Sequence, residues 1–186
     1  MKDLSLHFFD VLENSAKAGA SMVIFRLTWR GQWLSFAFLD NGPGFPPSIA
    51  ANPADPFLTT RRERSVGLGL ALLRQAAIAT GGGLTARNRP SGGAHVRGRI
   101  NVAHLDAQPL GRMDETIILA IAAWPSLNLL LRVGPQGKTR TILDTAAVKK
   151  EIGDLSINHP EIRRFVRETL RDGLREMQQW AEEQVS

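Results

Sequence analysis

LSFAFLDNGPG (residues 34–44) joins an alternating apolar strand to an acidic residue and a glycine-rich turn. Leu34, Phe36 and Phe38 recur at every second position, which predicts a strand with one buried face. The two glycines after Asp40 let the backbone pass close to a flat ligand, with the carboxylate pointing into the same cleft. The segment from Asp40 to Gly44 is also typical of a simple turn. It therefore indicates a ligand site only in combination with the neighbouring motifs.

A helix predicted over residues 3–18 precedes this strand and has two distinct sides. Apolar residues at i, i+4, i+7 and i+8 form one side, namely Leu4, Phe8, Val11 and Leu12. Polar residues spaced three, four and three apart form a second stripe, namely His7, Asp10, Asn14 and Lys17. A polar stripe of this kind is either a solvated face or one wall of a site.

After the turn, the chain predicts a long loop and then a second helix. Residues 41–65 contain five prolines and little periodicity, and long loops inside compact domains are usually functional lids or disordered segments. Val66-Gly67-Leu68-Gly69-Leu70 then opens a helix over residues 66–80. Free backbone N–H groups at a helix start suit phosphate oxygens, although an isolated G-x-G is common.

Alternating apolar residues predict a largely antiparallel sheet around these helices. Arg30-Gly31-Gln32 joins residues 34–38 to an earlier strand with Val23, Phe25, Leu27 and Trp29 on one face. A later strand directs Val96, Gly98, Ile100 and Val102 inward and leaves outward His95, Arg97, Arg99 and Asn101. The rest of the chain predicts a helix at 113–123, strands at 127–134 and 139–143, and helices at 145–152 and 160–182. The last helix should pack on the sheet through Ile162, Phe165, Val166, Leu170, Leu174 and Met177.

Composition favours a cytoplasmic protein without a membrane segment. The N-terminal residues do not resemble a signal peptide. The longest apolar region, residues 116–133, is interrupted by Pro125, Ser126 and Asn128, whereas a bilayer span needs about 20 apolar residues. The absence of cysteine excludes disulfides, thiolate metal sites and thiol nucleophiles.

The net charge of +5 is concentrated in the first part of the chain. Residues 1–104 contain 12 Lys+Arg and 6 Asp+Glu, whereas residues 105–186 contain 11 and 12. Four arginines flank one short loop and suit a polyphosphate, namely Arg61, Arg62, Arg64 and Arg74. A duplex-binding face normally shows a longer basic stripe and a docking motif, so no nucleic acid partner is expected.

The order of these motifs resembles the histidine-kinase-like ATPases, the superfamily of gyrase, mismatch-repair ATPases and heat-shock chaperone ATPases with the Bergerat ATP-binding fold. The resemblance covers about residues 5–102 and rests on several motifs in sequence. It implies an α/β protein, an α+β two-layer sandwich, with helices on one face of a mixed, largely antiparallel sheet and an ATP lid at about residues 45–65. Residues 1–104 would form the ATP-binding domain and residues 105–186 a small α/β C-terminal extension, as in small stand-alone bacterial members without a phosphoacceptor-histidine domain.

The resemblance assigns a nucleotide role to each motif. Asn14 would supply an amide oxygen to Mg2+, a hard cation that prefers oxygen ligands. Asp40 would accept the adenine amino group, and Lys17 would approach a phosphate. Further nucleotide contacts would come from the glycines after Asp40, the hinge of the lid and the start of the second helix, namely Gly42, Gly44, Thr59, Thr60, Arg61, Gly67, Leu68 and Gly69. Ala94 stands where the family frequently has threonine.

Asp10 is the candidate catalytic residue. In the hydrolysing branches a glutamate four residues before the metal-binding asparagine orients the attacking water, whereas histidine kinases commonly have an amide there. This chain has an acid that is one methylene shorter, and general-base geometry is demanding, at about 2.6 to 3.2 Å. Slow hydrolysis at best is therefore expected, while Lys17 follows the kinase-like pattern.

Three functions remain open at this point. The first is a Mg2+-dependent ATP-binding protein with slow hydrolysis that acts as a nucleotide-controlled switch through lid closure. The second is a protein kinase that transfers the ATP phosphate to a partner, and the third is a non-catalytic binding or scaffold module with a decayed nucleotide site. ATP or ADP and a protein of unknown identity are the expected partners, and homodimer formation is left open.

Two further patterns receive simpler interpretations. GPQGKT (residues 134–139) resembles a phosphate loop, but Arg132 stands where that loop requires its first glycine, so a hairpin turn is expected. His7 is followed by Phe8 and lacks the acidic residue that typically follows a kinase phosphohistidine. A hydrogen-bonding role is expected for His7.

Overall fold

The computed structural model describes residues 3–47, 50 and 68–183. These residues form a six-stranded sheet. The strand order is β3-β4-β2-β1-β5-β6. Neighbouring strands are antiparallel except β1 and β5, which run parallel. The predicted mixed, largely antiparallel sheet is therefore confirmed. The strands are β1 (Met22–Arg30), β2 (Trp33–Asp40), β3 (Gly83–Asn88), β4 (Ala94–Asn101), β5 (Asn128–Pro135) and β6 (Arg140–Asp144).

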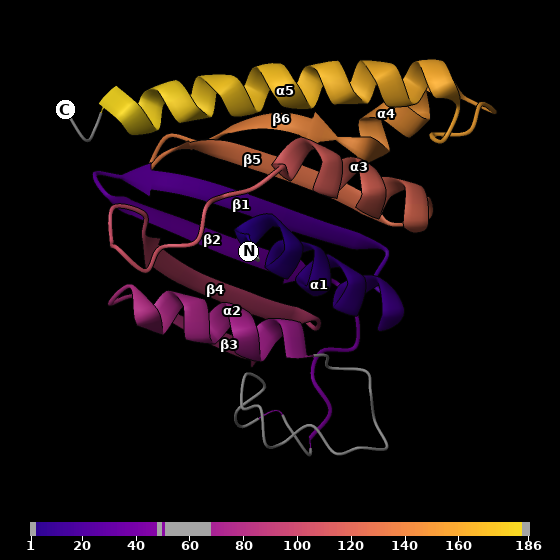
Figure 1. Cartoon of the computed structure of the whole chain (residues 1–186). Helices are drawn as coiled ribbons and strands as arrows, with labels where there is room; N and C mark the ends of the chain where they lie inside the picture. The colour runs from indigo at the N-terminus through magenta and orange to yellow at the C-terminus, as the bar shows by residue number, and fades with distance from the viewer. Residues whose placement is uncertain (1–2, 48–49, 51–67, 184–186) are drawn as a thin grey trace.

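Helices cover one face of this sheet (Figure 1). In that view α1, α2 and α3 lie in front of the strands, and α5 lies along the end formed by β5 and β6. The short helix α4 connects β6 to the segment before α5. The bounds of the helices agree with the sequence-based predictions to within one or two residues. They are α1 (Leu4–Lys17), α2 (Leu68–Ala79), α3 (Met113–Ala123), α4 (Thr145–Ile152) and α5 (Pro160–Glu183).

An aromatic cluster joins α1 to the centre of the sheet. The period of two in β1 and β2 directs Phe25, Phe36 and Phe38 to the helix-covered face. Phe8 of α1 is fully buried, and its ring centroid lies 5.3, 5.2 and 5.7 Å from those of Phe25, Phe36 and Phe38. The buried face predicted for α1 is confirmed. The three ring contacts of Phe8 hold α1 against β1 and β2.

The C-terminal part of the chain extends the same sheet and core. Strand β5 pairs with β1 in the register Val23↔Leu129 and Phe25↔Leu131, and all four side chains are buried. The hydroxyl of Thr116 in α3 lies 3.0 Å from that of Ser5 in α1. The division between residues 104 and 105 stays a prediction, but its two sides share one sheet.

Two apolar residues that were expected inside are exposed instead. Helix α5 packs on β5 and β6 as predicted, and Gly173 allows close approach because a Cβ there would meet Ile142. Phe165, however, is 56% exposed, since one residue turns an α-helix by about 100° and Val166 occupies the inner position. Val102 is exposed because β4 ends at Asn101.

The segment between β5 and β6 is a turn rather than a phosphate loop. Lys138 donates its backbone N–H to the Pro135 carbonyl at 3.0 Å, and Gly137 has a φ of +87°. This confirms the predicted hairpin. In the part of the chain that the structure describes, no helix is long and apolar enough to span a membrane.

Substituting Phe8→Ala should lower the free energy of unfolding by roughly 3–5 kcal/mol, because a fully buried ring leaves a cavity between α1 and the sheet. The matched control is Leu6→Ala on the same helix, where the side chain is 51% exposed and the expected change is within about 0.5 kcal/mol. Urea unfolding followed by circular dichroism measures both. Similar changes in the two variants would contradict the central role of Phe8.

Candidate functional site

Asp40 is the last residue of β2 and lies on the helix-covered face with 9% of its surface exposed. Its Oδ1 accepts hydrogen bonds from the backbone N–H groups of Gly42 and Ala94, both at 3.0 Å. Its Oδ2 accepts the Ser15 hydroxyl at 3.1 Å. Three donors from three elements therefore fix one carboxylate, and hydrogen bonds to a charged group contribute about 1.5–3 kcal/mol each.

The turn after Asp40 is fastened to the neighbouring loop by Asn41. The side-chain oxygen of Asn41 accepts the N–H groups of Ser21 and Met22 at 3.0 and 2.9 Å, and its amide donates to the Ser21 hydroxyl at 2.8 Å. Gly93 has a φ of +82°, and a Cβ there would collide with the Asp40 carbonyl. The backbone at Asp40 is thus held close both to the start of β1 and to Gly93, which precedes β4.

Asn88, at the end of β3, holds the segment that follows the turn. Its Oδ1 accepts the N–H of Phe45 at 2.6 Å, and its Nδ2 donates to the Phe45 carbonyl at 2.9 Å. Gly44 has a φ of +81°, and a Cβ there would lie 2.6 Å from the Asn88 oxygen. Glycine at 44 is therefore required both by conformation and by space.

A cavity of about 80 Å³ opens beside the Asp40 carboxylate. Ligand sites usually measure roughly 300–1,000 Å³, so this cavity would accept only one end of a nucleotide-sized ligand. Its floor and walls come from α1, the turn after β2, α2 and β4. The lining residues are Val11, Asn14, Ser15, Ala18, Asp40, Gly44, Phe45, Pro46, Leu70, Ala94 and Val96.

Asp10 lies against the first turn of α2. A Cβ at Gly69 would collide with the Asp10 side chain, so only glycine permits this packing of α1 on α2. Gly69 is the second residue of α2, where backbone N–H groups lack partners within the helix. The candidate catalytic acid and the glycine expected to receive phosphates are therefore neighbours.

The other two members of the polar stripe on α1 face different surroundings. Lys17 places its Nζ 3.0 Å from Glu13 Oε1, with 56% of its side chain exposed, so its phosphate contact stays a prediction. His7 is buried, and its Nε2 lies 3.1 Å from Gln108 Oε1. The hydrogen-bonding role expected for His7 is confirmed.

Part of the predicted site lies outside the described residues. Thr59, Thr60, Arg61 and Gly67 belong to residues 51–67, as does most of the predicted lid at 45–65, and the side chain of Leu68 is also outside the description. Their roles stay predictions.

Comparison with known proteins identifies the family of this chain. Residues 2–104 match the family model described as histidine kinase-, DNA gyrase B-, and HSP90-like ATPase. The chain belongs to this family. The match includes α1, the turn after β2, α2 and β4, and therefore every element that contributes to the Asp40 cavity.

Several sensor proteins resemble this chain over part of their length. Sensor protein KdpD of Escherichia coli (strain K12) is 41% identical over 93 residues, which are 47% of this chain and 10% of that protein. C4-dicarboxylate transport sensor protein DctB of Pseudomonas aeruginosa is 44% identical over 59 residues, 31% of this chain and 10% of that protein. The solved mycobacterial sensor histidine kinase MprB aligns with a TM-score of 0.38 and 27% identity, covering 49% of this chain and 64% of that one. The chain thus spans about a tenth of these curated relatives.

Membership in this family identifies an ATP-binding fold, and the Asp40 cavity lies within the matched residues. Asp40 presents a fixed acceptor to the cavity, and Gly44 leaves its own part of the lining without a side chain. The side-chain amide of Asn14 lines the same cavity and has no hydrogen-bond partner among the described residues. These three features leave polar atoms available to a bound nucleotide.

Sequence reasoning missed Ser15, Asn88 and Arg89, and it identified Gly93 only as part of the turn before the closing strand. Ser15 and Gly93 act through Asp40, and Arg89 donates from Nη1 to the Asp40 carbonyl at 2.9 Å. Asn88 and Arg89 lie 48 and 49 positions after Asp40, so only the strand register brings Asn88 to Phe45 and Arg89 to the Asp40 carbonyl. No local pattern could have identified them.

Gly69→Ala should destabilise the protein by about 1–3 kcal/mol, because the new methyl group overlaps Asp10. The cost should be clearly smaller when the substitution is made in an Asp10→Gly background, and urea unfolding of the four proteins measures the coupling. Gly83→Ala is the matched control, since a Cβ at Gly83 meets nothing within 4 Å. Additive effects of the two substitutions would contradict the Asp10–Gly69 contact.

Proposed function

We propose that this chain binds ATP together with Mg2+, hydrolyses it slowly and thereby acts as a nucleotide-controlled switch. The main support is the Asp40 carboxylate, which three donors hold at a cavity that Asn14 also lines. A rigid acceptor discriminates well between ligands, because a ligand without the matching donor leaves a buried polar group unpaired. The adenine amino group supplies that donor.

Asn14 would hold Mg2+ through its amide oxygen. In the described part of the chain, no group of three or more His, Asp or Glu side chains is arranged to hold a metal ion. Mg2+ commonly binds through one or two protein oxygens, substrate phosphates and several waters. A single asparagine beside the nucleotide cavity fits that mode of binding, and the bound ion would neutralise phosphate charge.

The position of Asp10 supports a hydrolytic role. Its side chain touches Gly69 at the start of α2, and the N-terminus of a helix favours phosphate groups. A carboxylate at this place could orient a water molecule toward the terminal phosphate. Because aspartate is one methylene shorter than the glutamate of the hydrolysing branches, turnover should be slow.

The switch itself requires that ATP binds one conformation better than another, since a ligand with equal affinity for both shifts nothing. The Asn88 side chain holds Phe45 beside the cavity, and this contact would serve as the fixed end of the predicted lid. Closure of the predicted lid over ATP would then alter a surface offered to a protein partner.

Phosphate transfer to a partner protein is the second candidate function. It is favoured by the similarity to proteins named as sensor or sensory histidine kinases. The two functions need the same nucleotide site and differ only in what accepts the phosphate. A decayed site without ATP affinity is the remaining alternative, and it is excluded if ATP binds.

Asp40→Asn should weaken ATP binding by roughly 100-fold or more, because the amide cannot offer Oδ2 as an acceptor to the adenine amino group. Calorimetric titration with ATP and Mg2+ measures this loss. Asp144→Asn is a matched control at the N-cap of α4, where asparagine caps as well as aspartate and affinity should not change. Unaltered affinity in Asp40→Asn would refute the site assignment.

Asp10→Asn should abolish slow phosphate release while leaving ATP affinity within a few fold, because the amide cannot accept a proton from water. Phosphate release under single-turnover conditions tests this, and Asp10→Glu should release phosphate faster than the native chain. Equal release by the native chain and Asp10→Asn would contradict a catalytic Asp10. Transfer of label from ATP to a co-purified protein would instead favour the kinase.

A further inference from the structure

The face of the sheet opposite the helices bears a concentration of arginines. Side chains on this face alternate with the buried ones, and six of them are arginine, namely Arg26 and Arg30 of β1, Arg87 of β3, Arg97 and Arg99 of β4, and Arg132 of β5. None of the six takes part in an ion pair among the residues that the structure describes. The positive charge of this face is therefore uncompensated.

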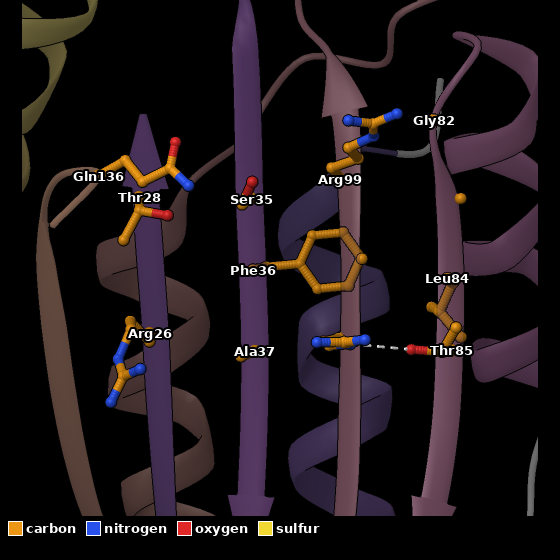
Figure 2. Close-up of a pocket in the computed structure, with 13 residues that line it drawn as sticks. Arg26, Thr28, Ser35, Phe36, Ala37, Gly82, Leu84, Thr85, Arg99 and Gln136 are labelled. Atoms are coloured by element: carbon orange, nitrogen blue, oxygen red, sulfur yellow. Dashed lines mark hydrogen bonds between the residues drawn. The ribbon is translucent and has the colours of Figure 1, made fainter. Parts of the chain in front are cut away.

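Small residues on the central strand turn this face into a trough. Ala37 of β2 pairs with Arg26 on one side and Arg97 on the other, so two guanidinium groups flank one methyl group. Figure 2 shows Arg26, Thr28 and Gln136 on one side of Ser35 and Ala37, with Arg99 and Thr85 on the other. The hollow has a volume of about 660 Å³.

A second hollow of about 620 Å³ continues the trough along β2. It shares Ser35, Arg99 and Gln136 with the first and adds Arg30 and Trp33. The Arg99 guanidinium lies 4.6 Å from the centre of the Trp33 ring. This end of the trough thus combines flat stacked groups with hydrogen-bond donors.

The charge on this face is strong enough to act on its one imidazole. The pKa of His95 is lowered from the ordinary 6.5, first by burial and then by repulsion from Arg87, Arg97, Arg89 and Arg26. A bound anion would relieve this repulsion. The face therefore favours a ligand with negative charge.

The shape of the trough limits which anion it fits. Successive outward residues on a strand are about 6.8 Å apart, so the arginines are spread along and across the sheet, and a single phosphate would leave most of them unpaired. A duplex presents grooves that a protruding helix or ribbon enters, which a hollow face does not. Repeated charge combined with flat rings describes a single strand, whose bases stack on aromatic and arginine planes.

We propose that the open face of the sheet, along β2 between Arg26 and Arg97, binds single-stranded nucleic acid. Arginines contact successive phosphates, and Trp33 with Arg99 stacks on a base. Thr28, Ser35 and Gln136 add donors for phosphate and sugar oxygens. Since Asp40 faces the opposite side of β2, this surface is separate from the nucleotide cavity.

Fluorescence anisotropy of the full chain with labelled 12-mers of oligothymidylate and oligouridylate, over a series of NaCl concentrations, tests the proposal. Affinity should fall with salt at a slope of about −0.7 per phosphate contacted. Arg26→Gln with Arg97→Gln should make the slope shallower by about 1.4, which is two contacts. Trp33→Ala should weaken binding roughly tenfold through lost stacking.

The matched control is Arg112→Gln with Arg171→Gln, which removes the same charge from arginines paired with Glu115 and Asp114. It should leave the slope unchanged, and Asp40→Asn should also bind the 12-mers normally. The proposal is wrong if the native chain shows no saturable binding, or if the control pair reduces the slope equally. Equal affinity for a labelled 12-residue polyglutamate would likewise overturn it and identify an acidic peptide.

Nuclear magnetic resonance of His95 gives an independent measurement on the folded protein. Saturating oligothymidylate should raise the pKa of His95, because phosphates offset the neighbouring arginines. Arg26→Gln with Arg97→Gln should raise the same pKa without ligand, because two of the repelling charges are removed. An unchanged His95 titration on addition of the 12-mer would contradict binding at this face.

Discussion

The alternation of side chains along β2 is the constraint on which the rest of the molecule depends. Phe36 and Phe38 point to the helices and form the aromatic cluster with Phe8, and Asp40 points the same way at the end of the strand. A shift of one residue would send all three to the other face. Burial of the phenylalanines therefore also determines where the carboxylate lies.

A buried carboxylate at this place costs free energy unless its oxygens are paired. Ser15, Gly42 and Ala94 supply three donors from α1, the turn and β4, so the three elements must assemble before the charge is satisfied. Glycine at 93 and at 44 permits the close approach that these contacts need. The three hydrogen bonds to Asp40 therefore form only when α1, the turn and β4 are correctly packed. The fold itself thus makes the Asp40 carboxylate rigid.

Local patterns predicted most of the helices and strands, because periodicity, caps and turns depend on residues that are close together in the sequence. The hairpin at Gly31, the helix over residues 113–123 and the buried face of α1 are examples. Asn88 and Arg89 were not predicted, since only the β3–β4–β2 register brings Asn88 to Phe45 and Arg89 to Asp40. The outward positions of Arg97 and Arg99 were predicted, but the arginine face as a whole was not, because its members come from four strands and form no basic run in the sequence. The expectation of no nucleic acid partner rested on the absence of such a run.

Three arginines elsewhere on the described surface are paired with acids. Arg112 contacts Glu115, Arg140 contacts Glu176 and Arg171 contacts Asp114, an arrangement that limits repulsion between like charges. On the open face Arg26 and Arg97 flank Ala37 without a carboxylate, and repulsion among such charges opposes folding. Stability alone would favour mixed charges there, as on α3 and α5. The repulsion between arginines on this face is better explained by an anionic ligand whose binding removes it.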